Sequence, residues 1–152
     1  EKLDRRILAA DNSEEMILVT PCNLPRALVR RIECFRCSAF ETGLAAGSVD
    51  NIFCMRLLHH IIDPSHRLTM LREFHRVTRA TVCVSLWVDG NYKAHRRMKL
   101  EARRSHENLQ NRGVVKRRTI ESEFMQAGFR IKGHFDLLKL YSMWRIYVLH
   151  KD

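Results

Sequence analysis

Asp11 is the first residue of the chain whose type and position could do chemistry. It follows the apolar stretch "RILAA", residues 6–10, which predicts a short buried strand. A carboxylate at the carboxyl end of such a strand can accept two hydrogen bonds from the 2′- and 3′-hydroxyls of a ribose. The alternative is that Asp11 caps the following helix, because Asp11, Asn12 and Ser13 are all good N-cap residues.

Histidine and cysteine provide further candidates. His59, His60 and His66 could include a general base or a set of metal ligands. Cys34 and Cys37 have C-x-x-C spacing, but they fall in a predicted strand, where residues three apart face opposite sides. The sequence has no second C-x-x-C and no H-E-x-x-H, so we predict no metal site.

A basic segment occupies residues 89–118, with Trp87 and Tyr92 near its start. Between Lys93 and Arg118, only Glu101 and Glu107 oppose the cations, which are Lys93, Arg96, Arg97, Lys99, Arg103, Arg104, Arg112, Lys116, Arg117 and Arg118. One interpretation is recognition of an anionic acceptor through arginine forks. The other is a solvated amphipathic helix with Met98, Leu100 and Leu109 facing inward. Aromatic residues are not interleaved with the cations, so stacking on single-stranded nucleic acid is not favoured.

Composition indicates one domain over residues 1–152 with enough apolar residues, 45%, to form a core. The formal net charge of +10 favours an anionic partner, whether nucleic acid, phospholipid or a phosphorylated metabolite. No run of 18 apolar residues is present, and "EKLDRRILAADN" does not resemble a signal peptide. The five cysteines are an odd number, which favours reduced thiols and a cytoplasmic location.

The elements that must position these residues alternate between strands and helices. Helices are predicted over residues 14–31, interrupted near Pro21, over 64–79, and from a cap at Thr119 to Gly128. Strands are predicted at 6–10, 32–40, 81–88 and from residue 49 onward, and two final strands close in sequence should pair antiparallel. This order predicts an α/β fold with a mostly parallel sheet and an antiparallel pair at its carboxyl terminus.

Several motifs, in this order, resemble the class I S-adenosylmethionine-dependent methyltransferases of the small-molecule type. They are "ADNSEEM" after the first strand, Asp50 at the start of a later strand, "LHHI" at 58–61, and Glu73 with Arg76-Val77 before the strand from Thr81. The resemblance runs from about residue 6 to 88 and continues more loosely to the end. It implies a Rossmann-like fold, S-adenosylmethionine as cofactor and methyl transfer to an acceptor. It also implies that the His59-His60 pair is mainly structural.

The resemblance assigns roles to residues of this sequence. Asp11 would hold the ribose hydroxyls, with Asn12 and Ser13 beside the adenine or ribose. Further cofactor contacts would come from Ser38, Ala39, Phe40, Cys54, Met55 and Arg56, with serine at 38 where the family usually has an acid. Acceptor contacts would come from Trp87, Tyr92, Arg96 and Arg97. A general base would be one of His59, Asp89 and Tyr92.

One part of the family pattern is missing from the sequence. Its six glycines form no GxGxG, and only about five residues precede the strand at 6–10, so we expect a domain truncated before its first strand. We then expect strands 6–10 and 49 onward to pair directly, or another chain to fill the gap in a swapped homodimer. We also expect weak cofactor binding by the chain alone. The alternative function is a catalytically inert Rossmann-like module that binds nucleic acid or an anionic surface through its basic arm.

Overall fold

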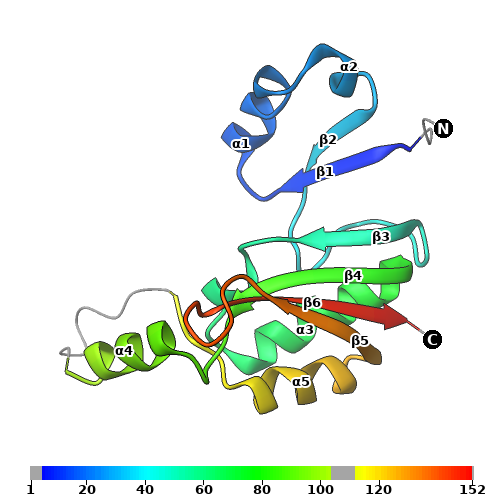
Figure 1. The fold of residues 1–152 in the computed structure, drawn as a ribbon. Helices are drawn as coiled ribbons and strands as arrows, with labels where there is room; N and C mark the ends of the chain where they lie inside the picture. The colour runs from blue at the N-terminus through cyan, green and yellow to red at the C-terminus, as the bar shows by residue number, and fades with distance from the viewer. Residues whose placement is uncertain (1–4, 104–111, 152) are drawn as a thin grey trace. The chain divides into compact units, whose positions relative to one another are not determined.

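The computed structural model describes residues 5–103 and 112–151, which form two compact units. The first unit is Glu1–Gly43 and the second is Leu44–Asp152. Among the described residues, no helix is long and apolar enough to cross a membrane. The two units are described separately below, and their elements are labelled in Figure 1.

The first unit is a two-stranded parallel sheet with short helices along its crossover. It contains β1 (Ile7–Asp11), α1 (Glu14–Val19), a 3-10 turn η1 (Pro21–Asn23), α2 (Arg26–Val29) and β2 (Ile32–Arg36). The register runs from Ile7 opposite Ile32 to Asp11 opposite Arg36. The predicted interruption at Pro21 is confirmed. β2 is shorter than predicted, because the chain turns after Cys37. The Cys37 amide donates to the Asp11 carbonyl at 3.1 Å.

The second unit is a four-stranded mixed sheet in the order β3-β4-β6-β5. Its elements are β3 (Val49–Cys54), a 3-10 turn η2 (Leu58–His60), α3 (Pro64–Val77), β4 (Thr78–Trp87), α4 (Tyr92–Glu101), α5 (Arg117–Gln126), β5 (Phe129–Asp136) and β6 (Trp144–Lys151). β3 and β4 are parallel, whereas β6 is antiparallel to both β4 and β5. The predicted α/β class, with parallel strands followed by an antiparallel pair, is confirmed.

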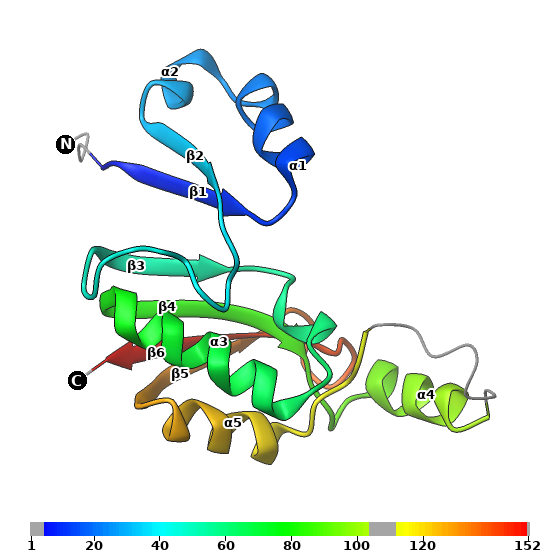
Figure 2. The ribbon, with the colours of Figure 1, turned by 180° about the vertical axis from the view of Figure 1, so that it is seen from behind.

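The core of the second unit lies between this sheet and two helices. α3 and α5 cover the same face of the sheet, which is seen from opposite sides in Figures 1 and 2. Val82, Val84 and Leu86 of β4 are fully buried, as are Phe124 of α5 and Tyr147 of β6. Alternation along the strand turns every second side chain toward the same face. The core therefore holds β4 in the middle of the unit and fixes the position of its carboxyl end.

Two points of the sequence analysis need correction. The helix expected from Thr119 begins at Arg117 with Lys116 as its cap residue, because the Asp89 carboxylate accepts the Arg117 amide at 2.9 Å. Met98 and Leu100, which one of the two interpretations of the basic segment placed inward, are exposed, because α4 buries only Ala94. Arg104, Glu107 and Leu109 lie outside the described residues.

Each parallel ladder in the described residues joins a strand to the next one in sequence: β1 pairs with β2, and β3 pairs with β4. The direct pairing of β1 with β3 stays a prediction. The helix predicted to end at Gly128 does end there, with that glycine at φ +93°. Glycine adopts left-handed φ at little energetic cost, which is why a glycine after an apolar helix predicts the end of that helix.

Candidate functional site

Asp11 lies at the carboxyl end of β1 and shapes the turn into α1. Its Oδ1 accepts the Ser13 amide at 2.8 Å, and the Ser13 hydroxyl accepts the Met16 amide at 3.3 Å. Ser13, and not Asp11, is therefore the N-cap of α1. Among the described residues no donor reaches Asp11 Oδ2, and the side chain is exposed. The carboxylate is held by one oxygen and presents the other.

Ser38, Ala39 and Phe40 follow β2 at the same edge of the two-stranded sheet as Asp11. Parallel strands bring their carboxyl ends to one edge, and Asp11 lies opposite Arg36 in the register. The Ser38 hydroxyl accepts the Phe40 amide at 3.2 Å and fixes a tight turn. Asn12 accepts Arg36 Nε through its carbonyl at 3.0 Å. The register thus brings the backbone of the predicted cofactor residues of the first unit to one edge of the sheet, and the Phe40 ring is exposed.

In the second unit, Cys54, Met55 and Arg56 lie where β3 ends. Burial raises the pKa of the Cys54 thiol to about 12, so it is not a nucleophile at neutral pH. Arg56 adopts a left-handed φ of +63°, and its amide donates to Ser85 Oγ at 2.8 Å. The sequence analysis did not identify Ser85. The feature that could have indicated it is a single hydroxyl side chain within the apolar run of β4. Ser85 holds the turn that presents Met55 and Arg56.

His59 is 3% exposed and lies among aromatic rings at the carboxyl ends of β3 and β4. Its ring centroid is 4.5 Å from that of Trp87, 4.9 Å from that of Trp144 and 4.2 Å from that of His60. Burial, followed by the charges of His60 and nearby arginines, lowers its pKa to about 4. Among the described residues, neither His59 Nδ1 nor Trp87 Nε1 has a hydrogen-bond partner. The cluster therefore contains a neutral imidazole and an indole N–H with unused hydrogen-bonding capacity.

The basic segment contacts this cluster through Arg97. Its guanidinium lies 4.5 Å from the centre of the Trp87 ring, in cation–π geometry. It also lies 2.7 Å from Glu101 and donates to the Arg112 carbonyl at 3.0 Å. Arg96 is exposed on α4, and no contact between it and Trp87 is found among the described residues. Of the two arginines predicted to bind an acceptor, the structure brings Arg97 to the cluster.

The three candidate bases differ in their surroundings. Asp89 accepts the first amide of α5 and lies 3.4 Å from Arg117 Nε, which gives it a structural role. Tyr92 is exposed and stacks on Tyr141, with ring centroids 5.8 Å apart and planes 8° from parallel. Only His59 lies in the aromatic and basic cluster. The sequence analysis did not identify Trp144 or Tyr141, which belong to β6 and to the turn before it. The sequence predicts that the last two strands pair antiparallel, but it does not predict which side chains they bring into contact.

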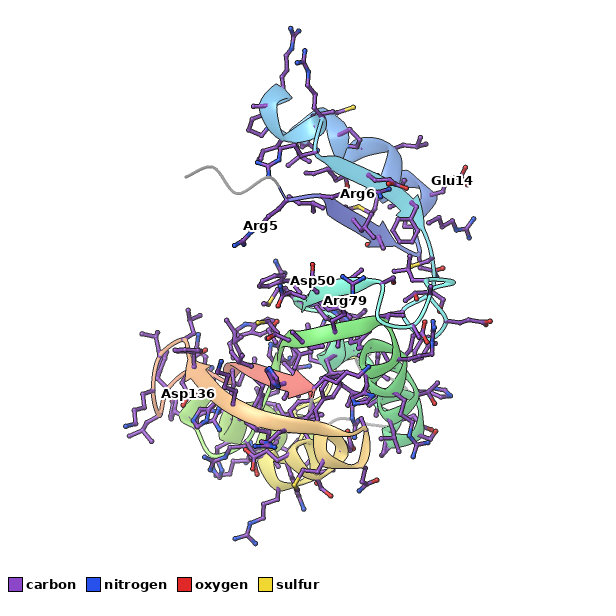
Figure 3. The ribbon with its side chains drawn as sticks, turned by 90° about the vertical axis from the view of Figure 1, so that its right-hand side faces the viewer. Arg5, Arg6, Glu14, Asp50, Arg79 and Asp136 are labelled. Carbon is purple, nitrogen blue, oxygen red and sulfur yellow. The ribbon has the colours of Figure 1, made fainter. Side chains whose placement is uncertain are left out.

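Two other features do not form a ligand or metal site. A surface hollow of about 370 Å³ is lined by arginines at the amino-terminal end of β1, but Arg6 pairs with Glu33 and Arg31 donates to the Arg5 carbonyl at 3.0 Å. Figure 3 labels Arg5 and Arg6. Within the described residues, no three His, Cys, Asp or Glu side chains are arranged to hold a metal ion.

Solved structures with a similar fold are enzymes of diverse reactions. A magnesium protoporphyrin IX methyltransferase from Synechocystis PCC 6803 is 13% identical, with a TM-score of 0.77 over 97% of this chain and 64% of its own. An S-adenosylmethionine-dependent methyltransferase from Methanosarcina mazei is 15% identical, with a TM-score of 0.73 over 96% of this chain and 82% of its own. The cyclase SpnF is 14% identical, with a TM-score of 0.72 over 97% of this chain and 66% of its own. At these identities the similarity shows the fold alone.

The sequence comparisons identify the family. No curated protein sequence matches the chain. A family model described as a methyltransferase domain matches residues 1–81, which is more than half of the chain. The matched residues include Asp11, the turn at Ser38–Phe40 and the end of β3, so the match covers all of the candidate cofactor residues. The chain therefore belongs to the methyltransferase domain family.

Proposed function

We propose that this chain is the larger part of an S-adenosylmethionine-dependent methyltransferase that acts on an anionic acceptor. Family membership supports the reaction class, and the chain spans 64% of the length of the protoporphyrin methyltransferase described above. The observation that carries the proposal is Asp11, whose Oδ1 is fixed by Ser13 while Oδ2 accepts no hydrogen bond from the described residues. A preorganised carboxylate of this kind suits a vicinal diol.

The donors and acceptors of the first unit fit the nucleoside part of the cofactor. Asp11 would accept from the two ribose hydroxyls, with Asn12 and Ser13 beside it. Phe40 would pack on the adenine face, and the hydroxyl and backbone of Ser38 and Ala39 would lie along the adenine edge. In the second unit we propose contacts from Cys54, Met55 and Arg56 to the sugar and methionine. A glycine-rich loop for the methionine end would come from outside these 152 residues, since the six glycines form no such motif.

The acceptor would bind at the cluster of His59, Trp87 and Arg97. When bound, the cofactor supplies an electrophilic methyl group on a sulfonium, and positioning of the acceptor against it provides most of the catalysis. Arg97, which lies over the Trp87 ring, would hold an anionic group of the acceptor. His59 is neutral at pH 7, so its imidazole can accept a hydrogen bond from an acceptor O–H or N–H. Tyr92 and Arg96 would line the entrance.

The test is calorimetric titration of S-adenosylhomocysteine into this chain and into the longest form of the protein. Asp11→Asn keeps an oxygen for the Ser13 amide but replaces the second acceptor with a donor. We expect at least about tenfold weaker binding, the effect of losing hydrogen bonds to a charged group. Asp50→Asn is the matched control, because Asp50 is an exposed carboxylate on β3 that pairs with Arg79 at 3.2 Å. Equal binding by wild type and Asp11→Asn, or none by either form, would reject the proposal.

The compartment belongs to the same proposal. All five cysteines have free thiols in the structure. Free thiols persist in reducing compartments, which supports a cytoplasmic enzyme. Mass measurement of alkylated protein from its native source would reveal disulfides if the proposal were wrong.

A further inference from the structure

An apolar turn between β5 and β6 projects several large side chains into solvent. Leu137 is 71% exposed, Leu138 57% and Leu140 74%. Soluble surfaces rarely gather large apolar side chains this densely unless they bind something. The turn takes no part in the function proposed above.

The turn is rigidly built. The Leu138 carbonyl accepts the amides of Tyr141 at 3.2 Å and Ser142 at 2.9 Å, while the Leu137 amide donates to the Trp144 carbonyl at 3.3 Å. Leu140 has a left-handed φ of +62°, which is uncommon outside glycine and asparagine. The backbone that carries the leucines is therefore held by its own hydrogen bonds, so that ordering this backbone on a partner costs little conformational entropy.

The first turn of α4 is bonded to this apolar turn. The amides of Tyr92 and Lys93 donate to the carbonyls of Leu140 and Tyr141 at 2.9 and 3.1 Å. The Tyr92 ring stacks on Tyr141, and Lys93 Nζ lies 5.0 Å from the centre of the Tyr141 ring. Figures 1 and 2 both show α4 extending from the region of this turn. The apolar turn and the basic helix thus form one surface.

Charge on this surface has one sign. Spacing of four and then three residues places Tyr92, Arg96 and Lys99 along one stripe of α4, and both cations are exposed. Lys139 adds a cation within the turn itself. The nearest acids are occupied: Asp136, labelled in Figure 3, accepts two bonds from Arg145 at 2.6 and 2.8 Å, and Glu101 lies 2.7 Å from Arg97.

We infer that the turn 137–141 and the stripe of α4 dock on an anionic phospholipid surface. Exposed leucines suit insertion among acyl chains, tyrosines suit the interface, and lysine and arginine suit anionic headgroups. Charge complementarity therefore favours this occupant over a neutral surface. The inference concerns location at a membrane surface and does not depend on methyl transfer.

The experiment is cosedimentation of the protein with vesicles. One set is phosphatidylcholine alone, and the other is equal parts phosphatidylcholine and phosphatidylserine. We expect binding to the anionic vesicles only, weakening as salt rises. Equal binding to both sets, or binding to neither, would overturn the inference.

Variants separate the two components of binding. Leu137→Ser with Leu140→Asn removes the two most exposed leucines, and asparagine tolerates the left-handed φ at 140. We expect at least about tenfold weaker partitioning, since each buried methylene contributes substantially to transfer into lipid. Met125→Ser, at an exposed apolar residue of α5, is the matched control and should bind normally. Lys99→Gln and Lys139→Gln should each weaken partitioning roughly fivefold.

Binding of S-adenosylhomocysteine by the same variants shows whether the fold is retained, because none of these residues is assigned to the cofactor. Gel filtration over a range of concentrations tests the competing occupant. If the leucine variant abolishes a dimer and leaves vesicle binding unchanged, the surface joins two copies and the inference is wrong.

Discussion

The two units differ in how many buried residues support the candidate site residues that each contains. Every described residue that is fully buried lies in the second unit, and none lies between residues 5 and 43. Asp11 is placed by a short parallel ladder and local caps, whereas His59 and Trp87 lie on a closed core. A two-stranded sheet contributes little stability by itself. The contrast indicates that the residues proposed to contact the acceptor are held by the core of the second unit, whereas those proposed to contact the ribose depend on local bonds.

The largest expected effect concerns the ion pair between Arg67 and Glu123. It is bidentate at 2.6 and 2.8 Å and buried, and Arg67 also donates to the Ile61 and Ile62 carbonyls just after His59-His60. Arg67→Met leaves Glu123 buried without its partner, so the free energy of unfolding should fall by about 3–5 kcal/mol in urea titration. Arg79→Met breaks the exposed pair with Asp50, shown in Figure 3, and should cost under about 1 kcal/mol. Similar losses from both variants would contradict this assignment.

The second prediction compares leucines from the two units. Leu149 of β6 is fully buried, and Leu149→Ala should lower the free energy of unfolding by about 2–5 kcal/mol. Leu8 of β1 is only half-buried, and Leu8→Ala should cost under about 1 kcal/mol. Chemical denaturation followed by far-ultraviolet circular dichroism, which reports on the helices and strands of both units, measures both losses. A larger loss for Leu8→Ala would show that the first unit has a core that this structure does not contain.

The third prediction concerns pH. The pKa of His59 is about 4 in the folded protein against an ordinary value of 6.5, so the unfolded chain binds a proton that the folded protein rejects. Stability should therefore decrease as pH falls from about 6.5 to 4, by up to about 3 kcal/mol from this group. His59→Phe should flatten the curve of unfolding free energy against pH.

Burial also lowers the pKa of His75, so part of the slope should persist in His59→Phe. The first unit contains no histidine, and its variants should keep the full pH dependence. An unchanged slope in His59→Phe would show that the imidazole is not neutral in its cluster.

The smallest effect is expected from helix caps. Ser13→Ala removes the cap of α1 and should cost about 1 kcal/mol of local stability. Asn91→Ala removes the cap of α4, a 2.9 Å bond to the Ala94 amide, at a similar local cost. Hydrogen exchange should show faster exchange of α1 amides in Ser13→Ala without change in β4. Accelerated exchange across both units would mean that they unfold together.

Much of the fold could be predicted from local patterns. The strands before Asp11 and over residues 81–88, the interruption at Pro21 and the end of a helix at Gly128 follow from apolar runs, proline and glycine, which act within a few residues. The cap of α5 could not be predicted, since Asp89 satisfies its first amide from 28 residues away. The interpretation that placed Met98 and Leu100 inward on α4 was wrong, because apolar spacing alone does not indicate that Ala94 is the buried residue of this helix.

The site shows the same division. The sequence by itself determined the family, the position of Asp11 after its strand and the basic character of residues 89–118, because these depend on residue order and charge. Tertiary structure decided that Arg97 covers Trp87 and that His59 is buried and neutral. These properties arise from distances and burial between segments far apart in the chain, which determine hydrogen bonding and the local electrostatic potential.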